Sequence, residues 1–161
     1  MSEYAARLRD RWQPGATIDA TEEMMGLALA IIIKVVLDMD IERDGGQLRA
    51  LLQVICKVSN QNTLPTLGEL FSKFPFSRAR RLEKSIGELD VILYRLIAQR
   101  RSNAEHHDDW LSGLIALRDA QDKSLGLTDV EVRDEALTLI TAGHETLGNA
   151  LSWTWYLLSQ N

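Results

Sequence analysis

Apolar residues recur along most of this chain three and four positions apart, the spacing that places them on one face of an α-helix. Capping residues and the positions of proline and glycine set the expected helix ends. The pattern predicts helices over Glu3 to Arg11, Asp19 to about Leu37, Gln47 to about Asn62, Ser77 or Arg78 to Arg101, and Trp110 to Asp119, and a long helix after Thr128. No stretch forms a convincing strand, so the expected fold class is all-α.

Two of the predicted helices begin with the spacing of a capping box. Asp19 is followed three residues later by Glu22, and Thr128 is followed three residues later by Glu131. In a capping box, the first side chain accepts a hydrogen bond from the backbone of the second residue, and the second side chain returns one. These pairs therefore predict where the second and the last helices start.

The most informative stretch is residues 135–153, a mostly apolar helix with a polar island at 143–146. At 3.6 residues per turn, one face carries small and polar residues: Thr138, Ala142, Glu145, Thr146 and Asn149. Gly143 leaves room for a flat or bulky group, at a propensity cost of roughly 1 kcal/mol relative to alanine. Thr146 can donate a hydrogen bond back to the carbonyl of Ala142. The face could thus form a groove whose hydroxyl and carboxylate relay protons to a bound ligand, or it could be a buried helix that tolerates a glycine.

Composition and charge exclude several classes of function. The 161 residues are 45% hydrophobic and 25% charged, which is ordinary for a soluble globular domain. A net charge of -5 argues against nucleic acid as a partner. The single cysteine, Cys56, has no internal disulfide partner and lies in an apolar run, so we expect it to be buried. The apolar run from Met24 to Leu37 is too short for a bilayer span and carries Lys34, so we expect a core helix; no leader pattern follows Met1.

The spacing of the histidines does not match the metal-binding motifs that it partly resembles. His144 and Glu145 begin a His-Glu-x-x-His pattern, but Gly148 stands where the second histidine is needed. A di-iron bundle needs Glu-x-x-His, and Thr141 precedes His144 by three residues. The run from His106 to Asp109 is polar and its residues are adjacent, so we expect surface rather than a metal site, with Asp109 capping a short helix.

The segment Ala142-Gly143-His144-Glu145-Thr146 resembles the oxygen-activation motif Ala/Gly-Gly-x-Asp/Glu-Thr of the haem-thiolate monooxygenases, the cytochrome P-450 superfamily. The similarity extends to the lead-in at 127–135, to the helix end at 92–101 that covers the substrate pocket in that family, and to residues 12–37. It covers essentially the whole chain, although only the central motif is specific. The family's Phe-x-x-Gly-x-x-x-Cys-x-Gly loop and Glu-x-x-Arg pair do not occur in the sequence. We therefore interpret residues 1–161 as a partial cytochrome P-450 domain, truncated before the haem-cysteine loop and inactive on its own.

The resemblance implies an enzyme that inserts one oxygen atom from O2 into a hydrophobic organic substrate. It implies that Thr146 and Glu145 are catalytic, that Ala142 and Gly143 contact the haem, and that substrate contacts come from four residues: Thr138, Thr141, Ala142 and Leu147. No metal ligand is assigned, because the family's axial cysteine has no counterpart here. His144 occupies a variable position of the motif, so we expect it to be packed or hydrogen-bonded rather than a ligand.

The same resemblance implies haem b as cofactor and electrons from NAD(P)H through a reductase or ferredoxin-type partner. The location would be cytoplasmic for a soluble enzyme of the bacterial type, and the sequence does not decide it. The apolar segment 63–77 would approach a mobile lid over the substrate entrance, or it packs on the core. A non-catalytic helical remnant or interaction module is the alternative from another functional class.

Overall fold

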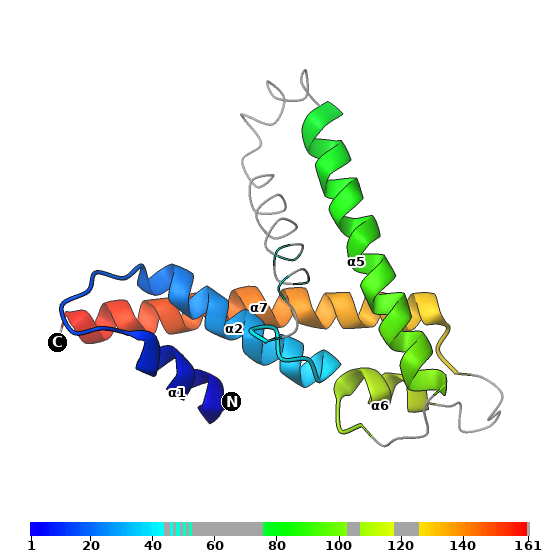
Figure 1. The fold of residues 1–161 in the computed structure, drawn as a ribbon, viewed down its shortest axis with the longest axis horizontal. Helices are drawn as coiled ribbons and strands as arrows, with labels where there is room; N and C mark the ends of the chain where they lie inside the picture. The colour runs from blue at the N-terminus through cyan, green and yellow to red at the C-terminus, as the bar shows by residue number, and fades with distance from the viewer. Residues whose placement is uncertain are drawn as a thin grey trace.

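The computed structural model describes residues 1–43, 46, 48, 50, 52, 76–102, 107–117 and 126–160. In this part of the chain the regular elements are all helices: α1 (Ser2–Arg11), α2 (Ala20–Leu37), α5 (Phe76–Ser102), α6 (Trp110–Ala116) and α7 (Asp129–Ser159). The all-α prediction is confirmed, and no strand occurs among the described residues (Figure 1). The predicted helix over 47–62 lies mostly outside the described residues, as do Cys56 and nearly all of the segment 63–77.

The two central helices, α2 and α7, lie side by side and run in opposite directions (Figure 1). Helix α5 crosses α7 near the start of α7, and α6 packs against α2, α5 and α7. Fully buried side chains from these four helices meet in one core: Ile33, Val36 and Leu37 of α2, Leu89, Leu93 and Ile97 of α5, Leu111 of α6, and Val132, Ala136 and Ile140 of α7. The run from Met24 to Leu37 is therefore a core helix, as expected.

Both predicted N-caps are present, but the capping box is complete only at Thr128, because Glu22 returns no hydrogen bond to the Asp19 backbone. The Asp19 carboxylate accepts hydrogen bonds from the backbone of Thr21 at 2.9 Å and of Glu22 at 3.1 Å. Thr128 and Glu131 form the complete capping box at the start of α7. Helix α6 is shorter than predicted, because Leu117 leaves the helix with extended backbone after donating to the carbonyl of Leu114 at 3.2 Å.

Two glycines allow α2 and α7 to approach closely. A Cβ atom built on Gly143 would lie 2.8 Å from the Cδ1 atom of Ile32. A Cβ atom on Gly148 would overlap the Sδ atom of Met25 and lie 3.2 Å from its Cα atom. Since Cα belongs to the backbone, Gly148 is the position at which the helix spacing itself depends on the missing side chain.

The last turns of α7 expose large apolar side chains. Trp153 is 64% exposed, and Tyr156, Leu157 and Leu158 are also exposed. On one side, Trp155 contacts Trp12, which follows α1, with ring centroids 5.4 Å apart in an edge-to-face arrangement. Across the described residues, no helix combines the length and apolar character needed to cross a bilayer.

Candidate functional site

A shallow groove runs along one face of α7. Its volume is about 620 Å³, and all of its lining residues belong to this helix: Leu137, Thr138, Thr141, Ala142, Glu145, Thr146 and Asn149. The face that the sequence predicts from helical periodicity is therefore a real surface of the molecule. It brings together five of the residues singled out from the sequence as site residues: Thr138, Thr141, Ala142, Glu145 and Thr146.

The hydroxyl of Thr146 donates a hydrogen bond to the carbonyl oxygen of Ala142 at 2.7 Å, as predicted. Three other hydroxyls of α7 make the same bond to the carbonyl four residues earlier, namely those of Thr141, Ser152 and Thr154. The bond is thus the usual behaviour of a hydroxyl within a helix. What distinguishes Thr146 from Thr154 is its place in the groove, where its oxygen can still accept a hydrogen bond from a ligand.

Glu145 and His144 lie next to each other in sequence but face different surroundings. The Glu145 carboxylate is half-buried and lines the groove. His144 is buried, and its ring hydrogen-bonds to the backbone of Met25 in α2. Burial lowers the pKa of the His144 imidazole, although Glu145 and the Met25 backbone act in the opposite direction. The expectation that His144 is a packed, hydrogen-bonded residue is confirmed.

Gly143 and Leu147 lie outside the groove. A side chain on Gly143 would point at Ile32, so the bulky neighbour that this glycine accommodates is a residue of α2. Leu147 is 38% exposed and does not line the groove. Helical geometry explains the difference, because residues 143 and 147 are separated from 142 and 146 by about 100° around the axis.

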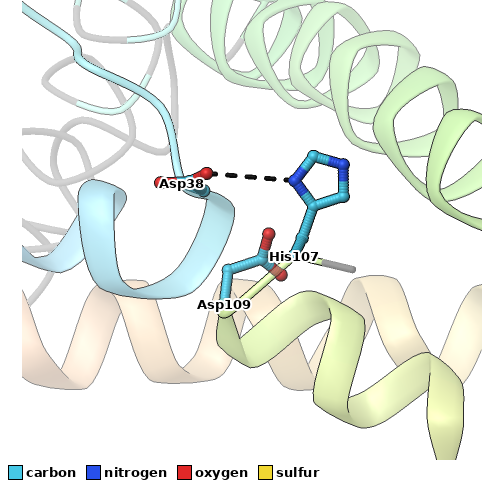
Figure 2. Close-up of side chains that lie close together, drawn as sticks. All are labelled: Asp38, His107 and Asp109. Atoms are coloured by element: carbon cyan, nitrogen blue, oxygen red, sulfur yellow. Dashed lines mark ion pairs between the residues drawn. The ribbon is translucent and has the colours of Figure 1, made fainter. Parts of the chain in front are cut away.

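A second polar cluster joins two segments that are distant in sequence. Figure 2 shows Asp38, directly after α2, facing His107, with Asp109 beside them; the atoms that could bind a metal lie within 4.8 Å of one another. The Nδ1 atom of His107 lies 3.9 Å from a carboxylate oxygen of Asp38. The expectation that this run is plain surface is wrong for Asp109, whose side chain is fully buried, while its predicted role as a helix cap is confirmed by a hydrogen bond from the Ser112 backbone at 2.6 Å.

The guanidinium of Arg100 already supplies the positive charge in this cluster. Its guanidinium donates to Asp109 at 3.2 and 3.0 Å and lies 3.2 Å from the Nε2 atom of His107. A metal ion would have to displace this positive charge from both residues. The cluster is therefore better explained as a structural junction than as a metal centre. Sequence reasoning could not find it, because no local spacing connects residues 38, 100 and 107–109.

Comparison with known proteins shows which family the chain matches. The family model described as Cytochrome P450 matches residues 1–161. A protein of Mycobacterium tuberculosis designated cytochrome P450 135A1 is 34% identical over 157 residues, which cover 92% of this chain and 33% of that protein. Pentalenene oxygenase of Streptomyces avermitilis is 29% identical over 153 residues, 94% of this chain and 33% of its own length. Cyclooctat-9-en-7-ol 5-monooxygenase of Streptomyces melanosporofaciens is 28% identical over 148 residues, 91% and 32% of the respective chains.

Solved structures share the fold. The heme domain of cytochrome P450DA superposes with a TM-score of 0.76 at 23% identity, covering 98% of this chain and 34% of that one. The retinoic acid bound cyanobacterial CYP120A1 gives a TM-score of 0.75 at 20% identity, with 98% and 34% covered. This chain spans about a third of the length of the curated relatives that it matches.

Proposed function

Because the chain belongs to the cytochrome P450 family, we propose that it forms the oxygen-activating segment of a haem-dependent monooxygenase that inserts one oxygen atom from O2 into a hydrophobic organic substrate. The observation that carries the proposal is the α7 groove, in which the Thr146 hydroxyl and the Glu145 carboxylate lie beside the small side chain of Ala142. Relatives named as an oxygenase and a monooxygenase support the reaction class.

A flat cofactor would have room on this open face of α7. Ala142 is exposed, and the side chains one turn before and one turn after it, Thr138 and Thr146, are short. Haem b would lie against Ala142 and reach Gly143 only through its backbone, since the Cβ direction of Gly143 faces α2. When bound, haem supplies the iron centre for dioxygen chemistry. The described residues contain no cysteine, so this groove supplies no thiolate ligand of its own.

The polar residues of the groove would then transfer protons to a bound ligand. The Thr146 hydroxyl is held in place by the Ala142 carbonyl and can accept a hydrogen bond from a ligand in the groove. Glu145 would take protons from solvent and pass them through water to that ligand, because its half-buried carboxylate is open to the groove. Thr138, Thr141 and Ala142 would contact the substrate; a contact from Leu147 stays a prediction, for a residue outside the groove.

Electrons would come from NAD(P)H through a ferredoxin-type partner or a reductase, as one-electron dioxygen chemistry at haem requires a donor. Candidate substrates follow from the relatives, so pentalenene and cyclooctat-9-en-7-ol are the first compounds to test. The 161-residue chain alone is expected to be inactive.

Isotope labelling tests the reaction class. The complete enzyme that carries this segment would be supplied with substrate, electron donors and ¹⁸O2, and the product analysed by mass spectrometry. A monooxygenase places one labelled oxygen in the product and the other in water. A product with two labelled oxygens, or one whose new oxygen comes from water, would contradict the proposal.

The alternative from another functional class is a non-catalytic helical interaction module. That function requires no chemistry in the groove. Substitutions at Glu145 and Thr146 would then leave every measurable property of the protein unchanged, apart from small effects on stability.

A further inference from the structure

A cavity beside the groove of α7 lies between α2, α5, α7 and Leu52, which belongs to none of these helices. Its volume is about 190 Å³, and six apolar side chains line it: Leu29, Leu52, Ile86, Leu89, Leu137 and Ile140. Engineered apolar cavities of about 150 Å³ stay dry and bind benzene or xenon. The cavity is therefore large enough for a molecule with a single ring.

The polar residues in its wall have donor groups engaged elsewhere. The Thr141 hydroxyl donates to the Leu137 carbonyl at 2.8 Å. The Arg133 guanidinium pairs with Asp90 of α5 at 2.7 Å and with Asp134 at 2.6 Å. His144, also in the wall, is bonded to the Met25 backbone. A buried water needs two to four polar partners, so this wall favours an apolar occupant over water.

The cavity shares two lining residues, Leu137 and Thr141, with the α7 groove. We propose that the cavity is a binding site for a small apolar molecule no larger than a single aromatic ring, adjacent to the groove and separate from it. A molecule bound there contacts the same two side chains that face the groove. The proposal rests on the cavity alone and needs neither haem nor turnover, so it can fail while the proposed function holds.

Benzene is the probe for a direct test on the complete enzyme that carries this segment, whose leucine and isoleucine methyl groups are isotopically labelled for NMR. Titration is expected to give saturable shifts confined to methyl groups of the cavity wall, such as those of Leu29, Leu89 and Ile140. Xenon is expected to compete with benzene for the same site. The absence of saturable shifts in the folded enzyme would overturn the proposal.

Two substitutions on α5 form a matched pair. Ile86 lines the cavity and is half-buried, whereas Val91 lies five residues further along α5 and is 59% exposed. Ile86→Phe fills the space and is expected to weaken benzene binding by roughly tenfold or more, while Val91→Phe leaves it unchanged. Equal benzene affinity in the two variants would place the site elsewhere and overturn the proposal.

A third variant keeps the test decisive if Ile86→Phe disrupts folding. Ile86→Ala enlarges the cavity, so it is expected to retain benzene binding and to admit toluene or a larger ring. Far-UV circular dichroism verifies the helical fold of each variant. An Ile86→Ala enzyme that folds and binds no aromatic ligand would also overturn the proposal.

Discussion

Arg100 of α5 directs two guanidinium nitrogens at one carboxylate oxygen of Asp109, the N-cap residue of α6, at 3.2 and 3.0 Å. The other oxygen of Asp109 accepts the backbone N–H of Ser112, and Arg100 also donates to the Leu37 carbonyl at 3.3 Å. The ion pair therefore connects the ends of α2, α5 and α6. It is shielded from water, because the Asp109 side chain has no exposed surface and that of Arg100 only 14%.

Asp109→Ala removes both the cap of α6 and the partner of a largely buried cation. The expected loss of unfolding free energy is about 3–5 kcal/mol, typical of breaking one side of a buried pair. Urea denaturation measures it. Asp108→Ala, at the exposed neighbouring position, is the control and is expected to change stability by less than about 0.5 kcal/mol. Equal losses in the two variants would contradict the structural role of the pair.

Divalent metal ions are expected to have no specific effect at the cluster of Asp38, His107 and Asp109, since Arg100 already neutralises it. The measurement is the melting temperature with zinc and with a chelator. A zinc-dependent rise in melting temperature that disappears in His107→Gln would show that a metal can displace Arg100.

The two glycines of α7 should respond differently to alanine. Gly148→Ala places a methyl group against the Met25 backbone and is expected to cost about 1–3 kcal/mol. Gly143→Ala meets the end of the Ile32 side chain, which can move, so its cost should be smaller. Gly87→Ala, in α5 with open space around it, is the control and should stabilise by roughly 0.5–1 kcal/mol. Thermal or urea unfolding ranks the three, and a tolerated Gly148→Ala would contradict the close helix approach.

Protonation of His144 should destabilise the fold. Burial holds the pKa of the folded imidazole below the ordinary value of 6.5, so the unfolded chain binds a proton more readily than the folded chain. Stability is therefore complete above that ordinary pKa and declines as the pH falls below it, toward the lower pKa of the folded state.

The check for His144 is unfolding free energy between about pH 7.5 and 5.5, a window above the ordinary pKa values of aspartate and glutamate. His144→Gln is expected to reduce the pH dependence of the unfolding free energy, whereas most of that dependence should persist in His107→Gln. An unchanged slope in His144→Gln would assign the effect to another group.

Local spacing predicted the parts of this structure that depend on neighbouring residues. The cap at Asp19, the capping box at Thr128 and the groove face of α7 all follow from residues three or four positions apart. The sequence did not predict that Gly143 faces α2. Periodicity fixes the angles between residues of one helix but leaves open which face of that helix meets α2. Local spacing also could not predict the Arg100 junction or the apolar cavity, since each is built from helices far apart in sequence.

The central claim is that the Thr146 hydroxyl takes part in oxygen activation within the α7 groove. Thr154 is a matched control, because it is also exposed and makes the same bond to the carbonyl four residues earlier, at 2.8 Å, yet lies outside the groove. Alanine substitution at either position therefore removes one helix-bonded hydroxyl, and only the substitution at Thr146 changes the groove.

The decisive measurement is the fraction of electrons recovered as oxygenated product in the complete enzyme, with hydrogen peroxide quantified in the same reaction. Thr146→Ala is expected to lower this fraction and to release the difference as peroxide, because the hydroxyl that assists proton delivery in the groove is lost, while Thr154→Ala behaves as the unsubstituted enzyme. Unchanged coupling in Thr146→Ala, or an equal loss in both variants, would contradict the role assigned to the groove.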